Sequence, residues 1–188
     1  MSKRPPQLIA LYSSVMQSGK SQVANTLVAT HGFKLVKFAD PIKDIIGGLL
    51  RKGGATEALI ERMLEGDLKE EMIPALGTSV RRMSQTLGDW GRSINPDFWV
   101  NIADPRIRAY AAEGFDVVVD DMRYPNEYER VLTLGGDPVW VNRPGAKPYL
   151  AHSSEGQLEG YPMSIFHNNA DLAQLRLDAE RLPGLLRG

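Results

Sequence analysis

An α/β fold built around a mainly parallel sheet is predicted for this chain of 188 residues. Short apolar runs alternate with segments of helical periodicity, which is typical of successive strand and helix units. The run FDVVVDD at residues 115–121 is β-branched in its middle and indicates a buried strand. The sequence contains no internal repeat and no long polar linker, so a single domain over residues 1–188 is expected.

The first elements follow from this pattern in chain order. A strand is expected over residues 7–12, and a turn rich in glycine and serine separates it from a helix over residues 20–30. A second strand covers residues 33–38. Asp40-Pro41 then begins a helix, because aspartate caps helices and proline suits their first turn. The later elements are expected at residues 53–114 (all helical), 115–121 (strand), 126–134 (helix), 138–141 (strand), 164–166 (strand) and 171–182 (helix).

Two segments depart from the alternation of strands and helices. Residues 41–113 are longer than a simple crossover needs, so they are expected to form a helical insertion between core segments 7–40 and 114–188. Residues 142–162 show little periodicity, and a loop of that length in a compact domain is typical of a lid or of a disordered segment.

The composition excludes several classes of protein. The 22 basic and 23 acidic residues give a net charge of -1, which argues against direct binding to nucleic acid or to a membrane surface. The absence of cysteine excludes disulfides, zinc thiolate sites and cysteine nucleophiles. No apolar stretch approaches the roughly 18–20 residues of a membrane span, and the N-terminal apolar run is too short for a signal peptide. A soluble cytoplasmic protein is expected.

The most specific motif follows the first strand. Residues 14–21, SVMQSGKS, match the pattern GxxxxGK[ST] at Gly19, Lys20 and Ser21 and depart from it at Ser14. In such a loop, backbone N–H groups bind phosphate oxygens, the lysine reaches the outer phosphates and the hydroxyl binds Mg²⁺. The residues expected to bind ATP are Ser14, Met16, Gln17, Ser18, Gly19, Lys20 and Ser21.

Two points about this loop stay open. The GKS tripeptide could merely open a helix with Ser18 as its cap, although its place between an apolar strand and a helix favours a phosphate loop. Ser14 would cost about 1–2 kcal/mol if its backbone were left-handed, and nothing if its φ were negative.

Acidic residues end the strand at 115–121. Asp120 or Asp121 is expected to hold Mg²⁺ together with Ser21, because phosphoryl transfer needs an acid on the metal side of the phosphates. Adjacent strand side chains face opposite ways, so one of the two faces the metal, and the sequence leaves open which. The alternative is that the pair caps the turn before Pro125. Arg123 also extends from this strand end, where open α/β sheets bind ligands.

The segment 79–101, SVRRMSQTLGDWGRSINPDFWVN, is the most informative part of the insertion. On a helical wheel its apolar positions form one stripe, at Val80, Met83, Leu87 and Trp90. Its polar positions gather elsewhere, at Arg81, Gln85 and Arg92. Arginine can hold a phosphate at two points and glutamine can pair with a base edge, but a solvated polar face is an equally good interpretation.

Two further features of this segment matter. Gly88 and Gly91 would end the helix early if they acted as breakers. Trp90 and Trp99 are expected in the core rather than as platforms for stacking bases.

Taken in order, the motifs resemble those of the deoxynucleoside monophosphate kinases of bacteriophages, part of the P-loop nucleoside monophosphate kinase-like group. They are SGKS at 18–21, FADPIK at 38–43, QTLGDWGR and DFWVN within 85–101, DDMRYPNE at 120–127 and HSSE at 152–155. The resemblance spans about residues 8–175 and departs from the family at Ser14 and at the doubled acid Asp120-Asp121. It implies a P-loop kinase fold of three α/β/α layers, with a five-stranded parallel sheet of order 2-3-1-4-5, a helical NMP-binding insertion and a lid.

The resemblance also implies an activity, which is transfer of the ATP γ-phosphate to a deoxynucleoside monophosphate with Mg²⁺, supplying precursors for DNA synthesis. Catalytic roles are implied for Lys20, Arg123 and Arg143. Contacts to the acceptor are implied for Asp40, Lys43, Arg81, Gln85, Trp90, Arg92, Asp121 and Arg123. The lid would contain Arg143, His152 and Glu155.

Other readings stay open at this point. The chain could be a P-loop kinase for another small acceptor, or a nucleotide-binding module without turnover. The sequence does not distinguish a monomer from a homodimer, and it does not identify the accepted bases.

Overall fold

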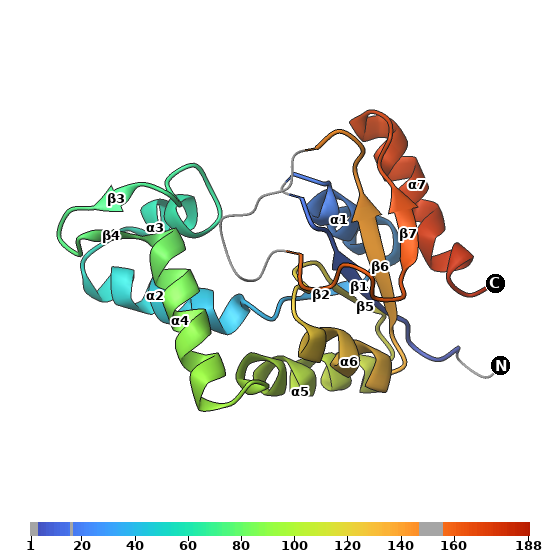
Figure 1. Cartoon of the computed structure of the whole chain (residues 1–188), viewed down its shortest axis with the longest axis horizontal. Coiled ribbons are helices and arrows are strands. Elements are labelled where there is room, and N and C mark those ends of the chain that lie inside the picture. Colours follow the sequence, from blue (N-terminus) through green and yellow to red (C-terminus); the bar gives the residue numbers. More distant parts are fainter. Residues whose placement is uncertain (1–3, 16, 147–155) are drawn as a thin grey trace. The chain divides into compact units, whose positions relative to one another are not determined.

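The structure is a computed structural model that describes residues 4–15, 17–146 and 156–188 (Figure 1). The chain forms two compact units, one of residues Met1–Phe38 and Ala103–Gly188 and the other of residues Ala39–Ile102. The boundary between Ile102 and Ala103 falls within helix α5 (Phe98–Ala112). The sequence predicts that all of these residues belong to the insertion. Each unit is described by itself below.

The first unit contains a five-stranded parallel sheet (Figure 1). Its strands are β1 (Leu8–Tyr12), β2 (Lys34–Val36), β5 (Val117–Val119), β6 (Asp137–Asn142) and β7 (Ser164–His167). They stand in the order β2-β5-β1-β6-β7. These labels differ from the predicted 2-3-1-4-5 because two short strands of the other unit also carry numbers. Counted within this sheet alone, the second, third, first, fourth and fifth strands follow one another.

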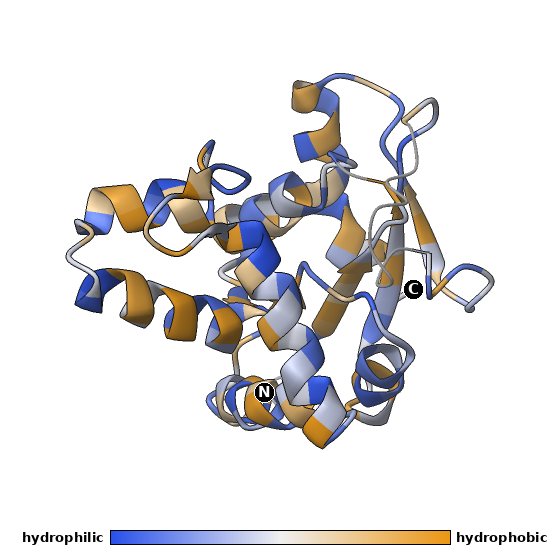
Figure 2. Cartoon of the chain, turned by 60° about the vertical axis from the view of Figure 1, so that its left-hand side comes forward, coloured by the Kyte–Doolittle hydropathy of each residue, from blue (hydrophilic) through white to orange (hydrophobic). Residues whose placement is uncertain are grey.

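Helices cover both faces of this sheet. Ile9 and Leu11 of β1 pack with α1 (Lys20–His31) and α7 (Leu172–Leu185) in one buried cluster. Leu8 points to the other face, where α6 (Pro125–Thr133) brings Val131 close to it. The alternation follows from the two-residue period of a strand, and β1 is buried on both faces as expected for a central parallel strand. The central strands are accordingly apolar along their length (Figure 2).

The second unit contains α2 (Asp40–Lys52), α3 (Glu57–Leu64), α4 (Val80–Ile94) and the first turn of α5. Its core consists of Ile42, Ile46, Leu50, Ile60, Val80 and Trp99. The prediction that residues 53–114 are all helical is wrong, because β3 (Met72–Ile73) and β4 (Thr78–Ser79) form an antiparallel ribbon. Gly77, with φ 63°, allows the turn between them.

The start of α2 also differs from the prediction. Ala39 occupies the N-cap position without a side-chain hydrogen bond, and Asp40 is the first residue of the helix rather than its cap. Pro41 lies in the first turn as expected, since its missing N–H needs no partner there.

None of the helices in the described ranges is both long enough and apolar enough to cross a membrane.

Candidate functional site

The loop between β1 and α1 has a backbone that tolerates the departure from the glycine pattern. Among the described residues, Gln17 is the non-glycine residue with positive φ, at 54°, so Ser14 has a negative φ and carries no left-handed strain. Gly19 is the N-cap of α1 with φ 100°, and no side chain caps the helix. The alternative in which Ser18 caps α1 is therefore wrong. The N–H groups of the first turn have no side-chain cap to satisfy them.

Two side chains hold the loop from outside. Arg143 donates from Nη1 to the carbonyl oxygen of Gln17 at 2.7 Å, and Asn168 donates from Nδ2 to that of Ser18 at 2.8 Å. In a trans peptide unit the C=O and the following N–H point in opposite directions. The N–H groups of Ser18 and Gly19 therefore point away from Arg143 and Asn168.

The interior of the loop contains an unsatisfied polar atom. Ser18 is 2% exposed, and its Oγ has no hydrogen-bond partner in the part of the chain that the structure describes. A buried hydroxyl without a partner costs free energy in the empty protein, and a ligand that accepts or donates a hydrogen bond there would recover it.

Gly19 is required by packing as well as by its φ. A Cβ built on Gly19 would lie 2.8 Å from Cδ1 of Leu175 and 2.9 Å from Nδ2 of Asn168. The loop therefore lies tightly against the residues that follow β7 and against α7.

A cavity of about 430 Å³ opens beside the loop within the first unit. It lies between the start of α1 and the start of α7. Its lining residues are Gln17, Ser18, Gly19, Lys20, Ser21, Gln22, Arg143, Asn168, Ala170, Asp171, Leu172 and Leu175. This volume falls within the usual range for small-molecule sites, and five of the residues predicted to bind ATP line it.

The two acids after β5 differ in their surroundings. Asp121 accepts a hydrogen bond at Oδ1 from the backbone N–H of Phe38 at 3.0 Å. Asp120 is 4% exposed, its Oδ2 lies 3.5 Å from Nζ of Lys37, and its Oδ1 has no hydrogen-bond partner among the described residues. Asp120 therefore has a carboxylate oxygen left for a ligand, whereas Asp121 uses Oδ1 to hold the end of β2.

The segment after these acids is held by Glu127, which is buried. Its Oε2 accepts hydrogen bonds from the backbone N–H groups of Arg123 at 2.6 Å and Tyr124 at 3.1 Å. This places α6 directly after the strand end and leaves the side chain of Arg123 exposed.

In the second unit, the predicted acceptor-site cations have acidic neighbours. Lys43 and Arg81 are hydrogen-bonded to Glu65 and Glu70, and Arg92 lies 3.3 Å from Asp89. The cations are half-buried, but their carboxylate partners are exposed to water. Ion pairs screened by water contribute only about 0–1 kcal/mol, so a phosphate could replace these carboxylates at little cost. Asp40 and Gln85 are half-buried at the start of α2 and in the middle of α4.

The two glycines of α4 do not end the helix, which continues from Val80 to Ile94. A Cβ on Gly91 would lie 2.6 Å from the ring of Trp99, and Nε1 of Trp99 donates to the carbonyl oxygen of Gly88 at 2.9 Å. The glycines and the tryptophan of this motif thus have a packing role. Trp99 is buried as predicted.

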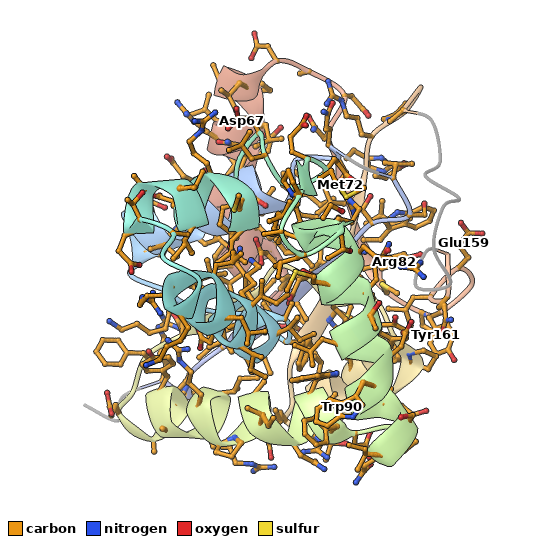
Figure 3. The ribbon with its side chains drawn as sticks, turned by 90° about the vertical axis from the view of Figure 1, so that its left-hand side faces the viewer. Asp67, Met72, Arg82, Trp90, Glu159 and Tyr161 are labelled. Carbon is orange, nitrogen blue, oxygen red and sulfur yellow. The ribbon has the colours of Figure 1, made fainter. Side chains whose placement is uncertain are left out.

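Trp90 is 51% exposed, so the prediction that it belongs to the core is wrong (Figure 3). Its ring meets that of Phe98 edge to face, with centroids 5.7 Å apart. Ile42, Ile46 and Leu50 of α2 contribute to the core of this unit. The apolar stripe of α4 therefore reaches the core without Trp90.

The structure adds two residues that the sequence reasoning missed, Lys37 and Asn168. Each stands just beyond the carboxyl end of a strand, which is the signal that could have found it. Met16, His152 and Glu155 lie outside the described residues. Across the described ranges, no group of three or more His, Cys, Asp and Glu side chains is arranged to hold a metal ion.

The sequence is similar to two viral proteins. One, from Acanthamoeba polyphaga mimivirus, carries the provisional name deoxynucleotide monophosphate kinase and is 28% identical over 168 residues, which are 80% of this chain and 83% of the relative. The other is the uncharacterised protein ORF77 of Ictalurid herpesvirus 1 (strain Auburn), 34% identical over 85 residues. That match spans 43% of this chain and only 37% of the relative. No model of a known protein family matches the sequence.

A solved structure shares the architecture. Dephospho-CoA kinase from Campylobacter jejuni superposes with a TM-score of 0.51 at 12% identity, over 98% of this chain and 100% of that chain. The chain therefore has a three-layer α/β fold of the kind found in this kinase, with a five-stranded parallel sheet.

Proposed function

We propose that this chain is an ATP-dependent kinase that transfers the γ-phosphate of ATP to a deoxynucleoside monophosphate. The observation that carries the proposal is the loop before α1, where Arg143 and Asn168 hold the carbonyls of Gln17 and Ser18. The N–H groups on the opposite side stand at the start of an uncapped helix, which is an arrangement suited to phosphate oxygens. The similar mimivirus protein, by its provisional name, supports a nucleoside monophosphate as the acceptor.

The ATP side of the proposal uses the start of α1. Lys20 and Ser21 are the first two residues of the helix and line the cavity beside the loop. In the proposed role, Lys20 neutralises charge on the outer phosphates, and Ser21 supplies a hydroxyl for Mg²⁺. Arg143 orients the loop through the carbonyl oxygen of Gln17, and its predicted catalytic role stays a proposal. The cavity would hold the remainder of the nucleotide.

The residues after β5 fit a magnesium ion that is bound together with ATP. Mg²⁺ takes oxygen ligands and commonly uses one or two carboxylates, several waters and phosphate oxygens. Asp120 has a buried oxygen without a partner in the described part of the chain, so we assign the metal-side role to Asp120 rather than Asp121. When bound, Mg²⁺ neutralises charge on the phosphates. Asp120 supplies the negative charge that holds it, and Arg123 remains the proposed contact to the transferred phosphate.

The acceptor side of the proposal uses the second unit. Arg81 and Arg92 on α4 and Lys43 on α2 would exchange their carboxylate partners for the acceptor phosphate. Gln85 lies between the two arginines in sequence and could pair with a base edge. The exposed ring of Trp90 is available to a planar ligand. Asp40 and Asp121 keep their predicted acceptor contacts as proposals.

The test is an acceptor panel. The purified chain is incubated with ATP, Mg²⁺ and, in turn, each deoxynucleoside and ribonucleoside monophosphate and one unphosphorylated nucleoside, and the ADP and product are measured. Lys20→Ala is expected to reduce turnover by about 100-fold or more, because it removes the cation proposed to neutralise the transferred charge. Lys52→Ala is the matched control, since Lys52 is exposed at the end of α2, and it is expected to retain turnover.

Each outcome has a distinct meaning. Deoxynucleoside diphosphate formed in proportion to ADP supports the proposal. Product formed only from unphosphorylated acceptors would make the chain a kinase of another kind, and ATP binding without transfer to any acceptor would make it a binding module. A bacteriophage origin, a cytoplasmic location and a role in DNA precursor supply stay predictions.

A further inference from the structure

The ends of β2 and β5 are joined twice. Val36 pairs with Val119 in a parallel register, so the residues that follow the two strands lie side by side. Nζ of Lys37 lies 3.5 Å from Oδ2 of Asp120. One residue further on, the backbone N–H of Phe38 donates to Asp121. Lys37 and Asp120 thus form an ion pair, and Phe38 and Asp121 form a hydrogen bond that holds the backbone.

The ion pair with Lys37 involves only one of the two carboxylate oxygens of Asp120. Asp120 is 4% exposed, and an ionised carboxylate at that depth needs a counter-charge or hydrogen bonds. Lys37 provides the counter-charge at Oδ2, and its side chain is 21% exposed. Oδ1 of Asp120 is buried and has no hydrogen-bond partner in the described ranges, so it can accept a ligand close to the ammonium group of Lys37.

A second cation at this oxygen would lie within a few ångströms of the lysine ammonium group. Like charges at that separation repel strongly where water is excluded. A divalent cation alone is therefore disfavoured at Asp120 while Lys37 stays in place. A cation that arrives with phosphate oxygens brings its own negative charge, and this offsets the repulsion.

We propose that Lys37 is a positioning residue that holds Asp120 in place and disfavours the binding of free divalent cations there, so that the metal enters as its nucleotide complex. The inference rests on the proposed function for the identity of that complex. The simpler alternative is that Lys37 only ties β2 to β5. The two differ in their response to metal, because a purely structural tie, once removed, is not replaced by a metal ion.

The test measures metal binding without nucleotide. Mn²⁺ serves as the probe, and its binding is followed by the electron paramagnetic resonance signal of free Mn²⁺ and by the thermal midpoint of unfolding. The wild-type chain is expected to bind Mn²⁺ weakly and to show no shift in midpoint. Lys37→Gln is expected to have a lower midpoint that Mn²⁺ restores and to bind Mn²⁺ at least ~10-fold more tightly, since a unit positive charge is removed beside the carboxylate.

Two control variants define the site. Lys34→Gln removes a lysine from the other end of the same strand, where Nζ lies 4.3 Å from the ring centroid of Phe115. Its midpoint is expected to fall without recovery in Mn²⁺. Combining Lys37→Gln with Asp120→Asn removes both charges and is expected to abolish the response to Mn²⁺. If Lys37→Gln is unfolded without metal, recovery of its circular dichroism signal on adding Mn²⁺ is the supporting result, and no recovery is the opposing one.

The proposal is overturned if Lys37→Gln binds Mn²⁺ no more tightly than the wild type, or if its loss of stability is the same with and without Mn²⁺. Because no nucleotide is present, these results do not depend on the acceptor panel. A chain that phosphorylates no acceptor could still show the response of Lys37→Gln to Mn²⁺, so the two failures are distinguishable.

Discussion

Replacing Gly19 with alanine tests whether the loop before α1 is held in one conformation by its neighbours. Gly19 has φ 100°, and a side chain there would cost about 1–2 kcal/mol of left-handed strain. The new Cβ would also lie 2.9 Å from Nδ2 of Asn168, so Asn168 must move and its hydrogen bond to Ser18 would be lost. A hydrogen bond of this kind contributes about 0.5–1.5 kcal/mol, which brings the expected loss of stability to about 1.5–3.5 kcal/mol.

Gly32 provides a matched control at the other end of the same helix. It caps the C-terminus of α1 with φ 72°, and an added Cβ would have no atom within 4 Å. Gly32→Ala should therefore cost only the left-handed strain, about 1–2 kcal/mol. The difference between the two variants isolates the contact with Asn168 and Leu175.

The assay is urea unfolding combined with the affinity of each variant for a fluorescent ATP analogue. In thermal unfolding of a chain of this size, a loss of about 1.5–3.5 kcal/mol corresponds to a fall of roughly 3–14 °C in the melting midpoint. Gly19→Ala should also weaken nucleotide binding, because the carbonyl of Ser18 is released and the adjacent N–H groups lose their orientation. Gly32→Ala should bind as the wild type does. Equal losses of stability, or unchanged nucleotide affinity in Gly19→Ala, would refute the reasoning.

Three further variants test other contacts. Arg143→Met should lower nucleotide affinity several-fold while changing stability by less than about 1 kcal/mol, because the side chain is exposed; isothermal titration calorimetry and urea unfolding measure the two effects. Gly91→Ala should cost about 1–3 kcal/mol through overpacking against Trp99, visible as altered tryptophan fluorescence and a lower urea midpoint. Burial raises the pKa of Asp116, but the hydrogen bonds from Arg4 and a backbone amide and the charges of two guanidinium groups outweigh it, so the pKa lies below its ordinary value of 3.8. The ionised carboxylate of Asp116 therefore stabilises the fold above pH 3.8, and this stabilisation is lost as the pH falls through the lower pKa of the folded state. Asp116→Asn should flatten the dependence of the free energy of unfolding on pH below 3.8. An unchanged slope in the variant would contradict this role of Asp116.

The elements with strong local signals could be predicted from the sequence. The central strand β1 and the helix α1 were predicted within a residue or two, because an apolar run, a glycine-rich turn and a helical stretch follow one another there. The ribbon of β3 and β4 could not be predicted, since each strand has two residues and no periodicity can show in so short a run. The exposure of Trp90 depends on which other helices fill the core of its unit, which is a tertiary effect that a helical wheel cannot contain.

The candidate site follows a simpler rule than its motifs suggest. In each of the five parallel strands, the first residue after the strand end is polar, and these residues are Ser13, Lys37, Asp120, Arg143 and Asn168. Carboxyl ends of parallel strands meet at one edge of the sheet, so topology alone gathers these side chains there. Lys37 was missed because the second strand was predicted to reach residue 38 and therefore contained it. Asn168 was missed because the last strand was predicted to end at residue 166, one residue short of its observed end. An error of one or two residues in a strand boundary is ordinary for sequence reasoning, but here it decides whether a polar residue is assigned to a strand or to the site.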